Sequence, residues 1–320
     1  MADPNQLYLI ASGINRYGSF IVSSLGSIGT IINIVIFSTD KELKKTPCSP
    51  FFVASSISAT ILLFSALLTR FLDVFSLNLT YYYDGICKVY IFFLLGSFYS
   101  SALFTSFLSI ERWLSSSRNA TLRQFASIKN AYRTIIITII IVSIFCSQVF
   151  YCYMANQISP RGQCSPMNTV CGYVNDLIHL ILFVIIPCSI MLIFGSLTLY
   201  NIKQNIHRVI PIQSLRTTQN DRRMMRIQST ITLMMFTQVC SLLLCNLSAG
   251  IQKIYSTITA NDYKTPQRRA IESIIFSIVY LLGYVFVALP FYLYTLAGAA
   301  FREALFRRIQ TIFRCHRMHQ

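Results

Sequence analysis

The chain has 320 residues, of which 54% are hydrophobic and only 12% are charged, and its formal net charge is +16 at pH 7. A soluble protein of this size carries about 25% charged residues, so the composition excludes an ordinary soluble domain. Because Lys and Arg gather in alternate loops between apolar runs, we attribute the positive charge to membrane topology and expect no nucleic-acid partner.

Seven apolar runs are long enough to cross a bilayer as helices, since a hydrocarbon core of about 30 Å needs about 20 residues. The first run starts near Ser19, and no small-residue cleavage site follows it, so we interpret it as a span rather than a signal peptide. The predicted fold is therefore an all-α bundle of seven transmembrane helices. The expected spans are 19–38, 50–72, 88–113, 132–155, 173–200, 227–254 and 271–296.

The distribution of Lys and Arg predicts the orientation of these spans. The loops after the first, third and fifth spans, together with the C-terminal segment, hold most of the 27 basic residues and should be cytoplasmic. The expected organisation is an extracellular N-terminus (1–18), a transmembrane receptor domain (19–297) and a cytoplasmic segment (298–320) in the plasma membrane. Within the last segment, residues 298–312 alternate apolar and basic residues as an amphipathic helix on the lipid surface does.

The third span places a cysteine and an ion pair at opposite membrane faces. Cys87 and Arg112 would lie about 37 Å apart along a helix, which exceeds the thickness of the hydrocarbon core. The triplet Glu111-Arg112-Trp113 ends this span. An adjacent acid and base at a wet boundary can exchange partners at low cost, as a switch requires. Alternatively, the triplet is an interfacial anchor in which Trp113 joins the aromatic belt.

Seven spans, a Cys at the start of the third and an acid-Arg-aromatic triplet at its end resemble the rhodopsin-like G-protein-coupled receptors, over essentially the whole chain. The resemblance implies a disulfide from Cys87 to the second outer loop. Cys164 is the favoured partner and Cys171 the alternative, because Cys171 begins the fifth apolar run. It also implies that Arg112, released from Glu111, contacts a heterotrimeric G protein.

Further markers agree in part with this family. Asn33 in the first span, where a buried amide would bond a neighbouring helix, is similar to the family pattern. Pro187 matches the fifth-span proline, which permits a local bulge, and Tyr294 has the family's spacing to a later Phe. The chain departs from the pattern where Pro290 replaces an Asn and Thr60 replaces an Asp, so it is identified as a divergent member, and the sequence leaves open whether the family's sodium site is kept.

Ligand chemistry is less well defined by the sequence. Leu94 stands where the family's amine receptors carry an Asp, and Tyr284 stands where opsins carry a Lys, so neither a cationic amine nor retinal is expected. Polar groups in the outer half favour a peptide or small polar ligand, although the same groups could instead join helices to one another. The pocket candidates are Leu94, Phe98, Asp176, His179, Lys253, Tyr280 and Tyr284.

Two residues are candidates for modification. Asn78 lies in an Asn-Leu-Thr sequon of the first outer loop. Cys315 follows the amphipathic segment and could be palmitoylated or remain a free thiol. No catalytic constellation, cofactor or metal site is expected. A polytopic transporter is the alternative function, although it would be favoured by inverted repeats and intramembrane charges that the sequence does not show.

Overall fold

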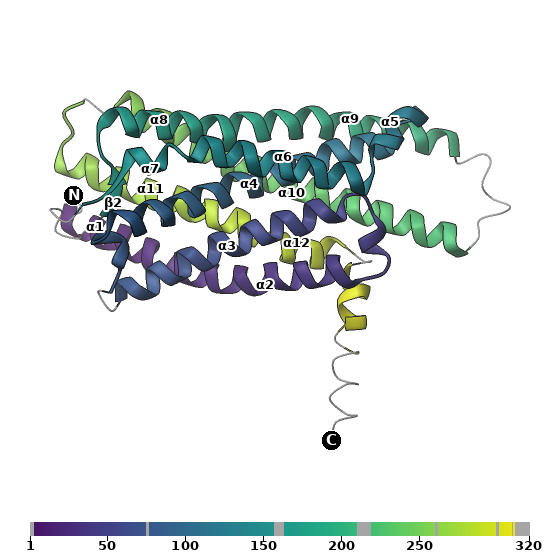
Figure 1. The fold of residues 1–320 in the computed structure, drawn as a ribbon, viewed down its shortest axis with the longest axis horizontal. Coiled ribbons are helices and arrows are strands. Elements are labelled where there is room, and N and C mark those ends of the chain that lie inside the picture. The colour runs from purple at the N-terminus through teal and green to yellow at the C-terminus, as the bar shows by residue number, and fades with distance from the viewer. Residues whose placement is uncertain are drawn as a thin grey trace, which may run out of the picture.

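The computed structural model describes residues 3–74, 77–156, 163–209, 219–259, 262–298, 301–308 and 310. Within these residues, seven helical segments are long and apolar enough to cross a membrane, which confirms the predicted seven-helix bundle. They run alongside one another as an elongated bundle (Figure 1). The helices are α1 (Pro4–Gly13), α2 (Ser19–Thr39), α3 (Ser49–Val74), α4 (Asp84–Ser116), α5 (Ala120–Phe125), α6 (Ile128–Cys146), α7 (Val149–Cys152), α8 (Thr169–His179), α9 (Ile186–Val209), α10 (Gln219–Ile258), α11 (Pro266–Ala288) and α12 (Pro290–Ala297).

The first span begins earlier than its apolar run indicates. The Asp3 side chain accepts a hydrogen bond from Asn5 N at 3.0 Å, and Pro4 occupies the first helical turn. Both are common signals of a helix start. A π-helical turn at Ile14–Gly18 then joins α1 to α2 without a break. The helix therefore extends back through most of the segment that was predicted to precede the first span.

Close packing of α2 against α11 depends on a glycine. A Cβ atom added at Gly26 would lie 2.5 Å from Ala288 Cβ and 2.8 Å from Leu63 Cδ1. Only a residue without a side chain allows this approach. In Figure 1, α2 also lies alongside α3 for much of its length.

The fourth span, predicted as 132–155, ends earlier than predicted. Helix α7 stops at Cys152, and residues 153–156 form strand β1 (Tyr153–Asn156) instead. This strand pairs antiparallel with β2 (Gln163–Pro166), with Ala155 opposite Cys164. The hairpin lies at the same end of the bundle as Cys87, which we call the disulfide end (Figure 1). The opposite end is called the Arg112 end.

Two prolines shape the helices that contain them. A π-helical turn at Leu180–Ile185 ends two residues before Pro187, as the proline permits, because proline has no N–H to bond the preceding turn. Pro290 starts α12 after Leu289 has ended α11. The seventh span is thus interrupted near the Arg112 end.

Residues 301–308 are helical and run across the bundle axis at the Arg112 end (Figure 1). Phe301 and Ala304 are fully buried, whereas Phe306 is 62% exposed. The Phe301 ring packs against Phe37 and Tyr294, with centroids 5.8 and 5.9 Å away. The predicted amphipathic helix is therefore present, but Phe306 lies outside its buried face.

Candidate functional site

Two disulfides fix the disulfide end. Cys87, at the start of α4, is bonded to Cys164 on β2, which is the pairing favoured from the sequence. The alternative partner, Cys171, is bonded instead to Cys152 at the end of α7. Cys152 lies within an apolar run, so the sequence did not identify it as a disulfide partner. Asp84 adds a polar contact, because its Oδ1 accepts a hydrogen bond from Ala155 N at 2.7 Å.

The hairpin covers a cavity of about 340 Å³ that opens into the bundle. Tyr153, Cys164, Ser165 and Pro166 contribute the hairpin side of its wall. Of the seven pocket candidates, all except Asp176 line this cavity: Leu94, Phe98, His179, Lys253, Tyr280 and Tyr284. The structure therefore brings together residues from α4, α8, α10 and α11 that are far apart in sequence.

Aromatic rings form much of the cavity wall. The Phe98 ring stacks on Phe183 with centroids 4.0 Å apart, and His179 lies 5.1 Å from Phe183. On the α11 side, the hydroxyl of Tyr284 donates to that of Tyr280 at 3.1 Å. Offset and tilted ring contacts of this kind stabilise an apolar wall in one arrangement. The cavity is thus largely aromatic with a few polar groups.

The polar groups at the cavity differ in how they are bonded. Asp176 forms an ion pair with Lys253 at 2.5 Å, joining α8 to α10 rather than facing the cavity. Both side chains are about one quarter exposed. Next to them, Asn175 lines the cavity, and its buried Oδ1 has no hydrogen-bond partner among the described residues. A buried acceptor without a partner is costly, so Asn175 offers a hydrogen bond to a bound molecule.

Glu111 and Arg112 form a buried ion pair at the other end of α4. Arg112 Nε donates to Glu111 Oε2 at 2.8 Å, and the two side chains are only 3% and 5% exposed. Ser115 donates to the other Glu111 oxygen at 3.0 Å. The expectation of a pair at a wet surface is therefore wrong. Separating a buried pair costs much more than separating an exposed one.

Cys48, which precedes α3, adds a further contact to this pair. A terminal nitrogen of Arg112 donates to Cys48 Sγ, and Cys48 is fully buried. Burial is the largest influence on Cys48 and raises the pKa of its thiol well above the usual value, although Arg112 opposes this. The thiol therefore stays neutral beside Arg112. The Trp113 ring contacts Phe194 on α9, with ring centroids 5.2 Å apart.

A buried hydrogen-bond network lies between the two sites. Gln238 on α10 donates to Thr105 Oγ1 on α4 at 3.0 Å and accepts from the Tyr294 hydroxyl on α12 at 2.5 Å. Thr105 in turn lies 3.2 Å from the Ser55 hydroxyl on α3. The chain of contacts joins four spans and is shielded from solvent, with Gln238 and Tyr294 each 2% exposed.

Tyr294 could be identified from the sequence, whereas Gln238 and Cys48 were not among the predicted residues. An uncharged polar side chain inside an apolar span is itself a signal of a helix-to-helix contact, and Gln238 carries that signal. Nothing in the local sequence of Cys48 distinguishes it from the other thiols near apolar runs. Its role follows only from the position of α3 beside α4.

Asn33 does not make the helix-to-helix bond expected of it. Its side chain is fully buried, and neither amide atom has a partner within the described part of the chain. Instead Thr30, one turn earlier, accepts a hydrogen bond from Thr60 on α3 at 2.9 Å. Thr60 also bonds the Ser56 carbonyl in its own helix at 2.8 Å, so its hydroxyl is directed towards α2 and its own preceding turn.

The modification candidates have different outcomes. Asn78 is only 2% exposed, and its Oδ1 accepts hydrogen bonds from Thr80 N and Oγ1 at 3.2 and 2.7 Å. The side chain caps the short turn Leu79–Tyr81, so the folded chain presents no exposed glycan acceptor there. Cys315 lies outside the described residues. Among the residues that are described, no group of three His, Cys, Asp or Glu side chains could hold a metal ion.

The chain matches a known protein family. Residues 29–289 match the model of the 7 transmembrane receptor (rhodopsin family), which covers most of the chain from α2 to the end of α11. No individual curated protein matches the chain significantly.

Proposed function

Because the chain belongs to the rhodopsin family of seven-transmembrane receptors, we propose that it binds an extracellular ligand at the disulfide end and activates a heterotrimeric G protein at the Arg112 end. The observation that carries this proposal is the buried Glu111–Arg112 pair. Because breaking a buried pair costs about 3–5 kcal/mol, the pair holds Arg112 in one arrangement until a ligand favours another.

The ligand is a small polar molecule or the end of a peptide. A cavity of about 340 Å³ is near the lower limit of pockets that take small ligands, which is about 300 Å³. Its aromatic wall suits an apolar group, and Asn175 Oδ1 needs a hydrogen-bond donor. The Asp176–Lys253 pair joins two helices at the cavity and can exchange partners with a charged ligand.

Activation is a population shift between two arrangements of the helices. In the resting arrangement, Gln238 ties α10 to α4 and α12, and Arg112 is held by Glu111 and Cys48. A ligand that favours movement of α9 and α10 away from α4 breaks the contact of Gln238 with α4. The contacts of Arg112 with Glu111 and Cys48 do not involve α9 or α10, and they exchange once this space has opened. Arg112 then becomes available to a G protein, to which its planar guanidinium offers several directed donors.

The orientation requires the disulfide end to face the outside of the plasma membrane. Disulfides persist in oxidising compartments, and both described bonds lie at one end. An epitope inserted at residue 5 should be reached by antibody on intact cells, and one at residue 318 only after permeabilisation. Equal access to both epitopes would contradict this orientation.

Nucleotide exchange by purified heterotrimers in vesicles tests the coupling directly and needs no known ligand. Replacing Glu111 by Gln leaves the buried Arg112 without its anionic partner, so basal exchange should rise several-fold. Arg112→Lys in the same background should abolish that rise, because Lys lacks the planar fork. Arg123→Lys is the matched control, since Arg123 is exposed on α5 at the same end.

Two outcomes would contradict the coupling proposal. If the Glu111→Gln, Arg112→Lys double variant kept the raised exchange at equal surface expression, the triplet would be only an interfacial anchor. If no heterotrimer responded and vesicles instead accumulated a labelled solute, the chain would be a transporter.

A further inference from the structure

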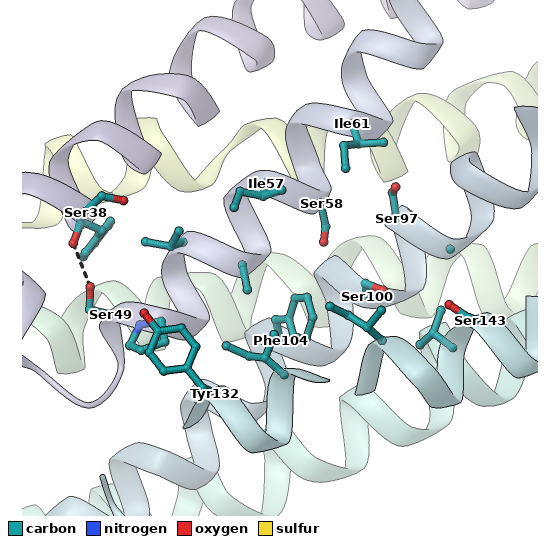
Figure 2. Close-up of a pocket in the computed structure, with 18 of the residues that line it drawn as sticks. Ser38, Ser49, Ile57, Ser58, Ile61, Ser97, Ser100, Phe104, Tyr132 and Ser143 are labelled. Atoms are coloured by element: carbon teal, nitrogen blue, oxygen red, sulfur yellow. Dashed lines mark hydrogen bonds between the residues drawn. The ribbon is translucent and has the colours of Figure 1, made fainter. Parts of the chain in front are cut away.

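A second cavity, of about 610 Å³, lies between α3, α4 and α6, away from the ligand cavity (Figure 2). Its walls are mostly apolar, with Ile57 and Ile61 from α3, Phe104 from α4 and Ile139 from α6. Ile61 and Ile139 are 41% and 48% exposed on membrane-spanning helices. The cavity therefore opens towards lipid rather than towards water.

Six serines line this apolar cavity, and four of them lie on the α3, α4 and α6 walls away from the start of α3: Ser58, Ser97, Ser100 and Ser143. Figure 2 shows them on three helices around one hollow. The side chains of Ser58, Ser97 and Ser100 are recessed, each 9% exposed or less. None of the four hydroxyls has a hydrogen-bond partner among the residues that the structure describes, whereas Ser65 on α3 bonds the Ile61 carbonyl at 2.6 Å.

Unbonded hydroxyls are costly at this depth. Ser58 is nine residues beyond Ser49, which begins α3, so it lies about 14 Å along the helix, or nearly half of a hydrocarbon core of about 30 Å. Water is scarce there, and a polar group without a partner loses several kcal/mol of solvation. The four hydroxyls thus indicate an occupant with a hydrogen-bonding oxygen at mid-membrane depth.

The same cavity reaches a cation at the Arg112 end. Lys44, in the short turn before α3, lines the cavity, is exposed, and has no ion pair within the described chain. Tyr132, on α6, lines the same cavity. From the membrane surface inwards, the cavity therefore presents a cation, then apolar walls, and then a group of hydroxyls.

We propose that this cavity binds a long-chain carboxylate whose chain carries a hydroxyl or similar oxygen group about midway. The carboxylate pairs with Lys44, the chain lies against the isoleucine and phenylalanine side chains, and the mid-chain oxygen bonds one or two of the serine hydroxyls. The proposed site is independent of the ligand at the disulfide end and would be reached from the bilayer.

Other occupants fit these observations less well. An unsubstituted acyl chain leaves the four hydroxyls unbonded. A sterol has one polar group at one end, so it satisfies Lys44 or the serines but not both. A helix of a second copy, about 10 Å across, is too wide to reach recessed serines in a hollow of this volume.

Ricinoleate and oleate form a matched pair of probes, because they differ only in a mid-chain hydroxyl. The full chain is placed in phosphatidylcholine nanodiscs, and saturable binding of each labelled fatty acid is measured. Ricinoleate should bind about tenfold more tightly than oleate, as one or two hydrogen bonds in an apolar site would give. Methyl ricinoleate, which lacks the charge, should compete poorly.

Variants assign the two contacts separately. The triple change Ser58→Ala, Ser97→Ala and Ser100→Ala should reduce ricinoleate binding to the level of oleate while leaving oleate binding unchanged, which also shows that the variant is folded. Lys44→Gln should weaken both probes equally. Ser65→Ala is the control, because the Ser65 hydroxyl is already bonded within α3 and does not line the cavity.

Several results would overturn the proposal. Equal affinity for the two fatty acids, absence of saturable binding, or an unchanged ricinoleate preference in the triple variant would each do so. Labelled cholesterol that binds and is lost in the triple variant would make the cavity a sterol site instead. A dimer that dissociates on the same serine changes would make it an interface between copies of the chain.

Discussion

The contacts that stabilise the disulfide end differ in kind from those that stabilise the Arg112 end. At the disulfide end, two covalent bonds fix the hairpin and the starts of α4 and α8. At the Arg112 end, the contacts are an ion pair and a hydrogen bond to a thiol, and the glutamine-centred network lies between the two ends. Covalent bonds preserve the shape of a pocket, whereas polar contacts can open and re-form. The difference therefore suits a receptor that recognises at one end and rearranges at the other.

Removing the covalent contacts should give the largest effect on stability. In the chain-entropy model, the Cys87–Cys164 bond, with a sequence separation of 77, contributes about 4.5 kcal/mol, and the Cys152–Cys171 bond, with a separation of 19, contributes about 3 kcal/mol. Double replacement of each pair by alanine should therefore lower surface expression and melting temperature, and more so for Cys87–Cys164. Thermal denaturation of the two double variants measures the difference.

The single variant Cys152→Ala provides the control for this prediction, because it frees Cys171 in the folded chain. If Cys171 then displaced Cys164 as the partner of Cys87, peptide mapping without reduction would show the exchange. Equal stability of both double variants and the wild type would mean that the hydrophobic cluster around Cys87 and Val149, rather than the disulfides, holds this end.

The comparison also shows which features the sequence could predict. The seven spans, the bulge near Pro187 and the register of Cys87 with Arg112 follow from local composition and from distance along one helix. The second disulfide and the burial of the Glu111–Arg112 pair depend on how separate helices pack. A linear pattern does not show that α3 brings Cys48 over Arg112, so a buried pair was mistaken for a surface pair.

Disrupting the hydrogen-bond network should have the next largest effect. It should change basal activity rather than surface expression. Gln238→Leu removes two buried hydrogen bonds and leaves the Tyr294 hydroxyl without its Gln238 contact. A net loss of about 1 kcal/mol for each bond would destabilise the resting arrangement and raise basal nucleotide exchange by about tenfold or more. Thr237→Val is the neighbouring control, because the Thr237 hydroxyl bonds Met234 O within its own helix at 2.8 Å.

A double-variant cycle sharpens this prediction. If Gln238 acts through Tyr294, adding Tyr294→Phe to Gln238→Leu should raise exchange little further, because the bond is already lost. Additive effects of the two changes would mean that they act separately, and an unchanged basal rate in Gln238→Leu would exclude the network as a restraint on α10.

The smallest expected effect is on melting temperature, and it concerns the contact between Asp40 and the helical segment 301–308 at the Arg112 end. Asp40 follows α2, and its Oδ2 accepts a hydrogen bond from Arg307 at 2.9 Å, while its Oδ1 accepts from Glu42 N and Leu43 N. Burial opposes ionisation of Asp40, but the backbone hydrogen bonds and Arg307 outweigh it and lower the pKa of the carboxyl. Arg307 is 44% exposed, so the ion pair contributes only about 0.2–1 kcal/mol.

A lowered pKa in the folded state fixes the sign of the pH dependence. The contribution of Asp40 to stability is fully present above the pKa of the unfolded chain, about 4, and is lost as the pH falls through the lower folded value. Asp40→Asn should therefore lower the melting temperature in nanodiscs by at most about 2 °C at pH 7, and the difference from wild type should shrink on acidification. Lys41→Gln, an exposed neighbour, also changes the charge by one unit without touching the contact. A difference that grew as the pH fell would mean that Asp40 is held by its neutral form, and the segment 301–308 would then depend on Phe301 packing alone.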